Sequence, residues 1–156
     1  MSNDCSVSLR RGKLEIMTNS SFLHGDPHVA RYLETDGEDG YHWRNDTEIL
    51  VLFTKGRKSG EERSHALIFR PYGEAYTVVA SKGGAEQAPA WFLNLQANPH
   101  VEVQIKGDRF AAVARVATPE EKPGVWATMV EAWPDYDSYQ KKTSREIPVV
   151  VLERVA

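Results

Sequence analysis

Three short segments of the sequence combine residue types that could hold an anionic, aromatic ligand. Residues 55–60 (KGRKSG) and 80–84 (ASKGG) each follow a strand-like run and combine glycine, serine and cations. Glycine, hydroxyl and cation at a strand end are the composition of an anion-cradling loop. Residues 133–139 (WPDYDSY) space Trp133, Tyr136 and Tyr139 three apart, so a helix would place them on one face, where they could cover an aromatic ring.

Each of these segments also has an ordinary structural explanation. Residues 55–60 could be a solvated hairpin turn, partly neutralised by neighbouring glutamates, and residues 80–84 a flexible loop. The three aromatic residues could be the packing face of a helix, which residue type alone favours. Trp91 by type belongs to the core, whereas Asn94 is unusual in a helix interior and could bond a neighbouring loop or a cofactor. The residues alone leave these alternatives open.

The composition indicates one ordinary globular domain. At 156 residues and 41% apolar, the chain can build one core, and a net charge of −3 argues against a general nucleic-acid binder. A single cysteine, Cys5, excludes an internal disulfide and favours the cytosol. The sequence has no apolar run of membrane-spanning length, no secretory signal and no metal-ligand spacing among its histidines. We expect residues 1–26 to be a flexible segment and residues 27–156 to be the single domain.

The hydrophobic pattern predicts an α+β domain with a mostly antiparallel sheet. Strands are expected at residues 49–53, 63–70, 75–80, 101–105, 110–117 and 149–152, helices at residues 27–35, 89–97, 118–133 and 135–142, and a turn at residues 71–73. Thr118 and Glu121 have the form of a capping box, and Pro123 with Gly124 predicts a kink or a late start of the third helix. Tight turns between successive strands favour hairpins, so about six strands with flanking helices suit a small barrel.

Four ordered motifs resemble the deazaflavin (coenzyme F420)-dependent nitroreductase and F420H2-dependent quinone reductase family, small reductases of actinobacteria. The motifs are residues 56–60 (GRKSG), 80–85 (ASKGGA), 89–99 (PAWFLNLQANP) and 133–148, which begins with WPDY and ends with IP. The resemblance extends over residues 48–154, whereas residues 1–47 match poorly. It implies a split β-barrel related to FMN-binding barrels, which agrees with the strand order read from the sequence.

The resemblance also implies roles for individual residues. Arg57, Lys58, Ser59 and Arg63 would hold the phosphate and the acidic glutamyl tail of F420. The residues that would contact the ring or complete its pocket are Ser64, His65, Ala66, Leu67, Ile68, Val79, Ala80, Ser81, Lys82, Ala90, Trp91, Asn94 and Tyr136. Some relatives have Asn-Pro at residues 65–66 and Tyr in place of Trp133, so this chain departs from the family pattern at the ring edge and lacks one phenol of the substrate wall.

Three of the implied residues would take part in the chemistry. Ser81 would form a hydrogen bond near the reacting centre, and Tyr136 would orient the acceptor or donate the accompanying proton, a step that water could also perform. Tyr139 would close the substrate side. The resemblance thus implies a cytoplasmic enzyme that transfers a hydride from reduced F420 to an electron-poor acceptor: a quinone, a nitroaromatic or an activated enone.

Two alternatives to this function remain open at the level of sequence. One is an FMN-dependent oxidoreductase of the same fold, in which the extra cations would lack a purpose. The other is a non-catalytic protein that carries the cofactor or a quinone. Arg10, Arg11 and Lys13 form a small basic cluster that leaves open a weak association with the inner membrane surface. Because one chain supplies every motif, we expect a monomer or a loose homodimer.

Overall fold

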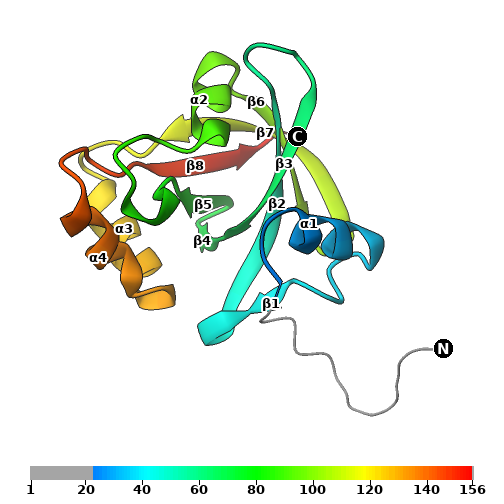
Figure 1. The fold of residues 1–156 in the computed structure, drawn as a ribbon, viewed down its shortest axis with the longest axis horizontal. Helices are drawn as coiled ribbons and strands as arrows, with labels where there is room; N and C mark the ends of the chain where they lie inside the picture. The colour runs from blue at the N-terminus through cyan, green and yellow to red at the C-terminus, as the bar shows by residue number, and fades with distance from the viewer. Residues whose placement is uncertain (1–22, 156) are drawn as a thin grey trace.

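The computed structural model describes residues 23–155 as a strongly curled sheet with helices packed around it (Figure 1). The strands of this part of the chain are β1 (His42–Trp43), β2 (Thr47–Lys55), β3 (Glu62–Ile68), β4 (Arg70–Tyr72), β5 (Ala75–Val79), β6 (His100–Ile105), β7 (Asp108–Val116) and β8 (Val149–Arg154). The α-helices are α1 (Gly25–Glu34), α2 (Ala90–Ala97), α3 (Lys122–Ala132) and α4 (Asp135–Lys142). Two 3-10 helices are η1 (Arg44–Asp46) and η2 (Lys82–Gly84).

One bent strand closes this sheet into a split β-barrel. The sheet runs from β2 through β6, β7 and β8 to β5. β3 pairs with β2, β4 pairs with β5, and only Phe69 separates β3 from β4. The two segments are therefore halves of one strand that joins both ends of the sheet. With β3 and β4 counted together and the two-residue β1 set aside, six strands form the barrel, so the predicted α+β split barrel is confirmed.

The turn predicted at residues 71–73 is wrong for its first two residues. Pro71 and Tyr72 belong to β4, where Pro71 pairs with Tyr76, and the turn begins at Gly73 with φ of 60°. β4 pairs with β5 alone among the described strands. On such an edge strand a proline does not interrupt a ladder on its free side, so it is tolerated.

The core lies between the curled sheet and the helices. In β2 and β8 the apolar runs read from the sequence are buried almost completely: Leu50, Leu52 and the segment 149–152 are 0% exposed. A continuous apolar run, rather than an alternating one, is typical of a strand covered on both faces. The predicted strands at residues 49–53 and 149–152 are thus correct, and the structure extends each of them by a few polar residues.

The helices follow their local signals closely. Pro89 caps α2, and Asn98 with Pro99 ends it. Thr118 and Glu121 form both hydrogen bonds of the predicted capping box: the Thr118 N–H donates to Glu121 Oε1 at 2.9 Å, and the Glu121 N–H donates to Thr118 Oγ1 at 3.2 Å. This box holds a turn ahead of the helix, so α3 has the predicted late start, at Lys122.

The N-terminal prediction is covered only in part. Of the expected flexible segment 1–26, residues 1–22 lie outside the described residues, while Gly25 and Asp26 already belong to α1. The basic cluster of Arg10, Arg11 and Lys13 also lies outside the described residues. Within residues 23–155, no helix is long and apolar enough to cross a membrane.

Candidate active site

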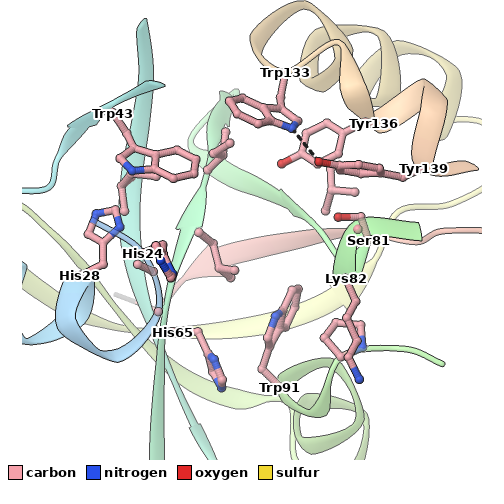
Figure 2. A pocket seen from close by; sticks show the side chains of 18 of the residues that line it. His24, His28, Trp43, His65, Ser81, Lys82, Trp91, Trp133, Tyr136 and Tyr139 are labelled. Atoms are coloured by element: carbon pink, nitrogen blue, oxygen red, sulfur yellow. Dashed lines mark hydrogen bonds between the residues drawn. The ribbon is translucent and has the colours of Figure 1, made fainter. Parts of the chain in front are cut away.

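One candidate site is a cavity of about 520 Å³ between the curled sheet, α1, α2 and the corner between α3 and α4 (Figure 2). We call it the aromatic cavity, because Trp43, Trp91, Trp133, Tyr136 and Tyr139 line it. The residues predicted from the sequence that line it are His65, Ala66, Leu67, Ile68, Val79, Ser81, Lys82, Ala90, Trp91, Tyr136 and Tyr139. The fold therefore brings together side chains from β3, β5, η2, α2 and α4 that lie far apart in the sequence.

A second cavity of about 280 Å³, which we call the cationic groove, adjoins the first. It is lined by Gly56, Arg57, Lys58, Ser59, Arg63, His65, Ala90 and Asn94. No carboxylate belongs to this lining. His65 and Ala90 line both cavities, so the aromatic cavity and the cationic groove meet at these two residues.

Residues 56–60 belong to the hairpin turn between β2 and β3, as their structural explanation predicted. The same turn carries cations that line the groove. The Gly56 N–H donates to Glu61 O, and the Gly60 N–H donates to Gly56 O, each at 2.8 Å. The Ser59 hydroxyl accepts from the Glu61 N–H at 3.1 Å. A Cβ atom at Gly56 would come within 2.8 Å of Ser59 Oγ, so a larger residue there would require the Ser59 side chain to move.

Asn94 fixes this loop to α2. Its Oδ1 accepts from the Arg57 backbone N–H at 3.1 Å and from Arg57 Nη1 at 2.9 Å, while its Nδ2 donates to Thr54 Oγ1 at 3.3 Å. Asn94 is 4% exposed, so these bonds satisfy an amide that would be costly to bury alone. Asn94 thus bonds a neighbouring loop and places Arg57 along the groove, while its implied contact with the cofactor stays a prediction.

Arg145 holds the second loop, and the sequence reading missed it. Its guanidinium donates to the carbonyl oxygens of Ala80, Ser81 and Ala85 at 3.2, 2.9 and 2.8 Å. Within the same loop, a Cβ atom at Gly84 would lie 2.7 Å from the Tyr139 carbonyl oxygen, so only glycine lets η2 pack this closely on α4. Both contacts fix the place of Ser81, which lines the cavity beside Tyr139 (Figure 2).

The predicted aromatic wall forms, although across a corner rather than on one helix. Trp133 caps the C-terminal end of α3, whereas Tyr136 and Tyr139 belong to α4. Trp133 Nε1 donates to the Tyr139 hydroxyl at 3.3 Å, and the rings of Tyr136 and Tyr139 meet edge to face at 6.0 Å. Burial raises the pKa of Tyr136 far above its ordinary value, so its phenol stays protonated.

The wall opposite was not predicted. His24, Gly25 and His28 line it from α1 and its N-cap, and Trp43 lines it from β1. The His28 ring donates through Nε2 to Gly40 O at 2.8 Å, and burial lowers its pKa, which favours the neutral ring. The sequence analysis found no metal-ligand spacing among the histidines and gave His24 and His28 no role. The described residues hold no group of three metal-ligating side chains.

Two of the predicted contacts lie outside both linings. Ser64 pairs with Phe53 in the β2–β3 ladder and belongs to neither cavity. Ala80 is 0% exposed, and its carbonyl oxygen accepts a hydrogen bond from Arg145. Both residues position neighbours that do line the site, His65 and Ser81.

Comparison with known proteins gives a consistent result. The sequence model of the family described as F420H(2)-dependent quinone reductase matches residues 26–154. An F420H(2)-dependent quinone reductase of Mycobacterium tuberculosis is 38% identical over 130 residues, which cover 81% of this chain and 87% of the relative. A solved structure described as an F420-H2 dependent reductase is 40% identical with a TM-score of 0.63, covering 67% of this chain and 93% of that one.

A further solved structure, described as a domain-swapped dimer, is 39% identical with a TM-score of 0.66 and covers 80% of this chain and 93% of that one. The match of the family model over most of the chain bears out the four motifs recognised in the sequence. The chain belongs to the F420H(2)-dependent quinone reductase family, whose members are oxidoreductases that use coenzyme F420.

Proposed function

We propose that this F420-dependent reductase acts on quinones, and that nitroaromatics and activated enones of similar shape are accepted in the same place. The observation that carries the proposal is the junction of the aromatic cavity with the cationic groove at His65 and Ala90. A ligand that is flat and aromatic at one end and polyanionic at the other fits this pair of cavities. The quinone is the acceptor in the family's own description.

The residues present fit the cofactor by their chemistry. F420 carries a phosphate and several carboxylates beyond its ring, and Arg57, Lys58 and Arg63 line the groove, whose lining includes no carboxylate. We assign these three, with Ser59, to the tail. Val79, Ala90 and Trp91 would flank the ring, and Lys82 would meet an anion at the opposite edge. FMN has one phosphate and no glutamyl tail, so it would leave most of these cations without a partner.

The chain's own contribution to the chemistry is to place the reactants and to keep bulk water away from them. When bound, reduced F420 supplies a hydride, and with one added proton a quinone becomes a hydroquinone. The aromatic wall would hold the acceptor flat against the cofactor ring. The Ser81 hydroxyl has no hydrogen-bond partner within residues 23–155 and is 8% exposed, so it is available to donate to a ring oxygen or nitrogen.

Tyr136 would orient the acceptor rather than release its own proton. The pKa of its phenol is raised by burial, so transfer of its proton to the reduced acceptor would be unfavourable. A protonated phenol remains a good hydrogen-bond donor, and no other described residue takes that bond. In this assignment a water molecule delivers the proton, while Tyr139 closes the substrate side.

Changing Tyr136→Phe is therefore expected to slow turnover about tenfold, the value of one lost hydrogen bond to the acceptor, without changing the affinity for F420. Steady-state oxidation of F420H2 with a fixed quinone measures the first quantity, and fluorescence titration of oxidised F420 measures the second. Tyr72→Phe is the matched control, because its hydroxyl bonds Glu121 outside both cavities. Full activity of the Tyr136 variant would remove its orienting role.

The cofactor assignment is tested by titrating oxidised F420 and, in parallel, FMN into the purified protein and following fluorescence. Saturable binding of F420 at micromolar concentration or below, with FMN much weaker, is expected. Tight FMN binding without a response to F420 would contradict the proposal. If the protein binds F420 but does not catalyse the oxidation of F420H2 by any acceptor tested, the result would instead support the non-catalytic carrier.

Assembly and location stay predictions. Every residue of the proposed site comes from one chain, which is compatible with a monomer or a loose homodimer, and domain swapping is described for a relative. The cytoplasmic location rests on the sequence argument from the single cysteine.

A further inference from the structure

Two tryptophans from opposite sides of the aromatic cavity meet face to face, and we call this pair the indole arch. Trp43 comes from β1, Trp133 from the end of α3, and both line the cavity. Their ring centroids lie 5.5 Å apart with 22° between the ring planes. In Figure 2 the two indoles approach each other from separate walls at the end of the cavity away from His65 and Trp91.

Each indole is held at its edge by a hydrogen bond, which leaves its face for stacking. Trp43 Nε1 donates to Leu23 O at 2.8 Å, and Trp133 Nε1 donates to the Tyr139 hydroxyl at 3.3 Å. The Arg44 guanidinium lies 4.6 Å from the Trp43 ring centre. The arch is thus a fixed structure that links β1 to the α3–α4 corner across the cavity.

The arch stands apart from the part of the site assigned to the cofactor tail. The cationic groove joins the aromatic cavity at His65 and Ala90, and neither tryptophan lines that groove. If the cofactor tail occupies the groove, its ring enters from the His65 side. The space left for the acceptor then extends towards α1 and β1, where the arch limits it.

We propose that Trp43 is a specificity-determining residue that, by stacking on Trp133, limits the size of the flat acceptor the cavity admits. This inference rests on the proposed function, because it takes the acceptor to be a quinone-like ring. Both indoles are half-buried at the cavity edge. Removing one would therefore enlarge the acceptor space more than it would damage the core. Stacking adds only a small increment to what the buried area of an aromatic pair contributes, too little for the fold to depend on this pair.

The test compares one small and one large quinone in the full chain. Duroquinone has one ring, and 9,10-phenanthrenequinone has three fused rings. In Trp43→Ala, the ratio of kcat/KM for the three-ring quinone to that for the one-ring quinone is expected to rise about tenfold, the scale of discrimination a pocket gains from local shape. Trp133→Ala should give the same shift, and the double variant little more, because both changes remove one shared contact.

A binding measurement makes the test independent of turnover. Calorimetric titration of the two quinones into protein loaded with oxidised F420 should show the same change in their affinity ratio, while the affinity for F420 stays within about twofold of the unaltered protein. Trp43→Phe, which keeps an aromatic face, should restore much of the original ratio. Trp126→Ala is the matched control: Trp126 is also half-buried and lies on α3, but it bonds Asp137 and lines neither cavity.

The outcomes separate the arch from the proposed function. An unchanged ratio in Trp43→Ala, an equal loss for both quinones, or no quinone binding to any variant overturns the role of Trp43. If the unaltered protein binds F420 but reduces no acceptor, the proposed function fails, and the calorimetric ratio still decides the role of the arch.

Discussion

Replacing both Lys58 and Arg63 by glutamine is expected to weaken the binding of oxidised F420 about 100-fold. A charge-assisted hydrogen bond contributes about 1.5–3 kcal/mol. Because both side chains are exposed to solvent, we expect each of their bonds to contribute near the lower end of that range. Both side chains line the cationic groove, and within residues 23–155 the ion-pair partner of Arg63 is the distant Glu61 at 3.8 Å. Arg57 is left unchanged because it also holds Asn94. Fluorescence titration at low and at high salt measures the effect, and the loss should shrink at high salt.

Lys55→Gln provides the control for this prediction. Lys55 ends β2 next to the same loop, carries the same charge and does not line the groove. If Lys55→Gln weakens F420 binding by about half the binding free energy that the double groove variant loses, the attraction is a general effect of charge. If the double variant binds F420 within about twofold of the unaltered protein, the assignment of the tail to the groove is wrong.

Changing Arg145→Ala is expected to lower the free energy of unfolding by about 3 kcal/mol, because three loop carbonyl groups lose their charged donor at once. For a chain of this length that corresponds to a fall in Tm of roughly 6–12 °C. The loop carries Ser81, so turnover should fall more than the affinity for F420 does. Thermal unfolding, kcat and F420 titration measure the three quantities.

Two further variants sharpen this result. Arg145→Lys should recover only part of the lost stability, since a single ammonium cannot reach three carbonyl oxygens in the way a planar guanidinium does. Arg154→Ala, which removes an exposed pair with Asp108 at 3.0 Å, should cost less than about 1 kcal/mol. An unchanged Tm in Arg145→Ala would show that water satisfies the loop carbonyls equally well.

Local sequence patterns were sufficient to predict the strands, helix boundaries and loops that surround the site. The apolar runs of β2 and β8 and the Pro89 and Asn98–Pro99 boundaries of α2 are signals contained in a few consecutive residues. The loops that line the site were also visible, because glycine, serine and cations follow strands directly. Tight hairpins then required an antiparallel sheet, and the barrel followed from the number of strands.

Other features depend on partners that are distant in the sequence, and local patterns do not carry them. β4 was hidden because Pro71 reads as a turn residue, and only its pairing with β5 makes it a strand. Trp43 stands in a polar stretch with no periodicity, and its place in the cavity depends on Trp133. Arg145 meets carbonyl groups some sixty residues earlier in the chain, a relation that no motif describes.

The position of β8 makes the aromatic cavity depend on a strand that is synthesised after every other strand of the described part. β8 is inserted between β5 and β7, although it is the last strand of the described part of the chain (Figure 1). The loop with Ser81 follows β5 directly, and the Ala80 N–H donates to Pro148 O at 3.0 Å. A nascent chain that has not yet reached residue 149 would keep two unpaired strand edges and an unanchored loop. Closure by such distant segments is slow compared with hairpin formation, so the aromatic cavity forms only after β8 has been synthesised and has paired with its neighbours.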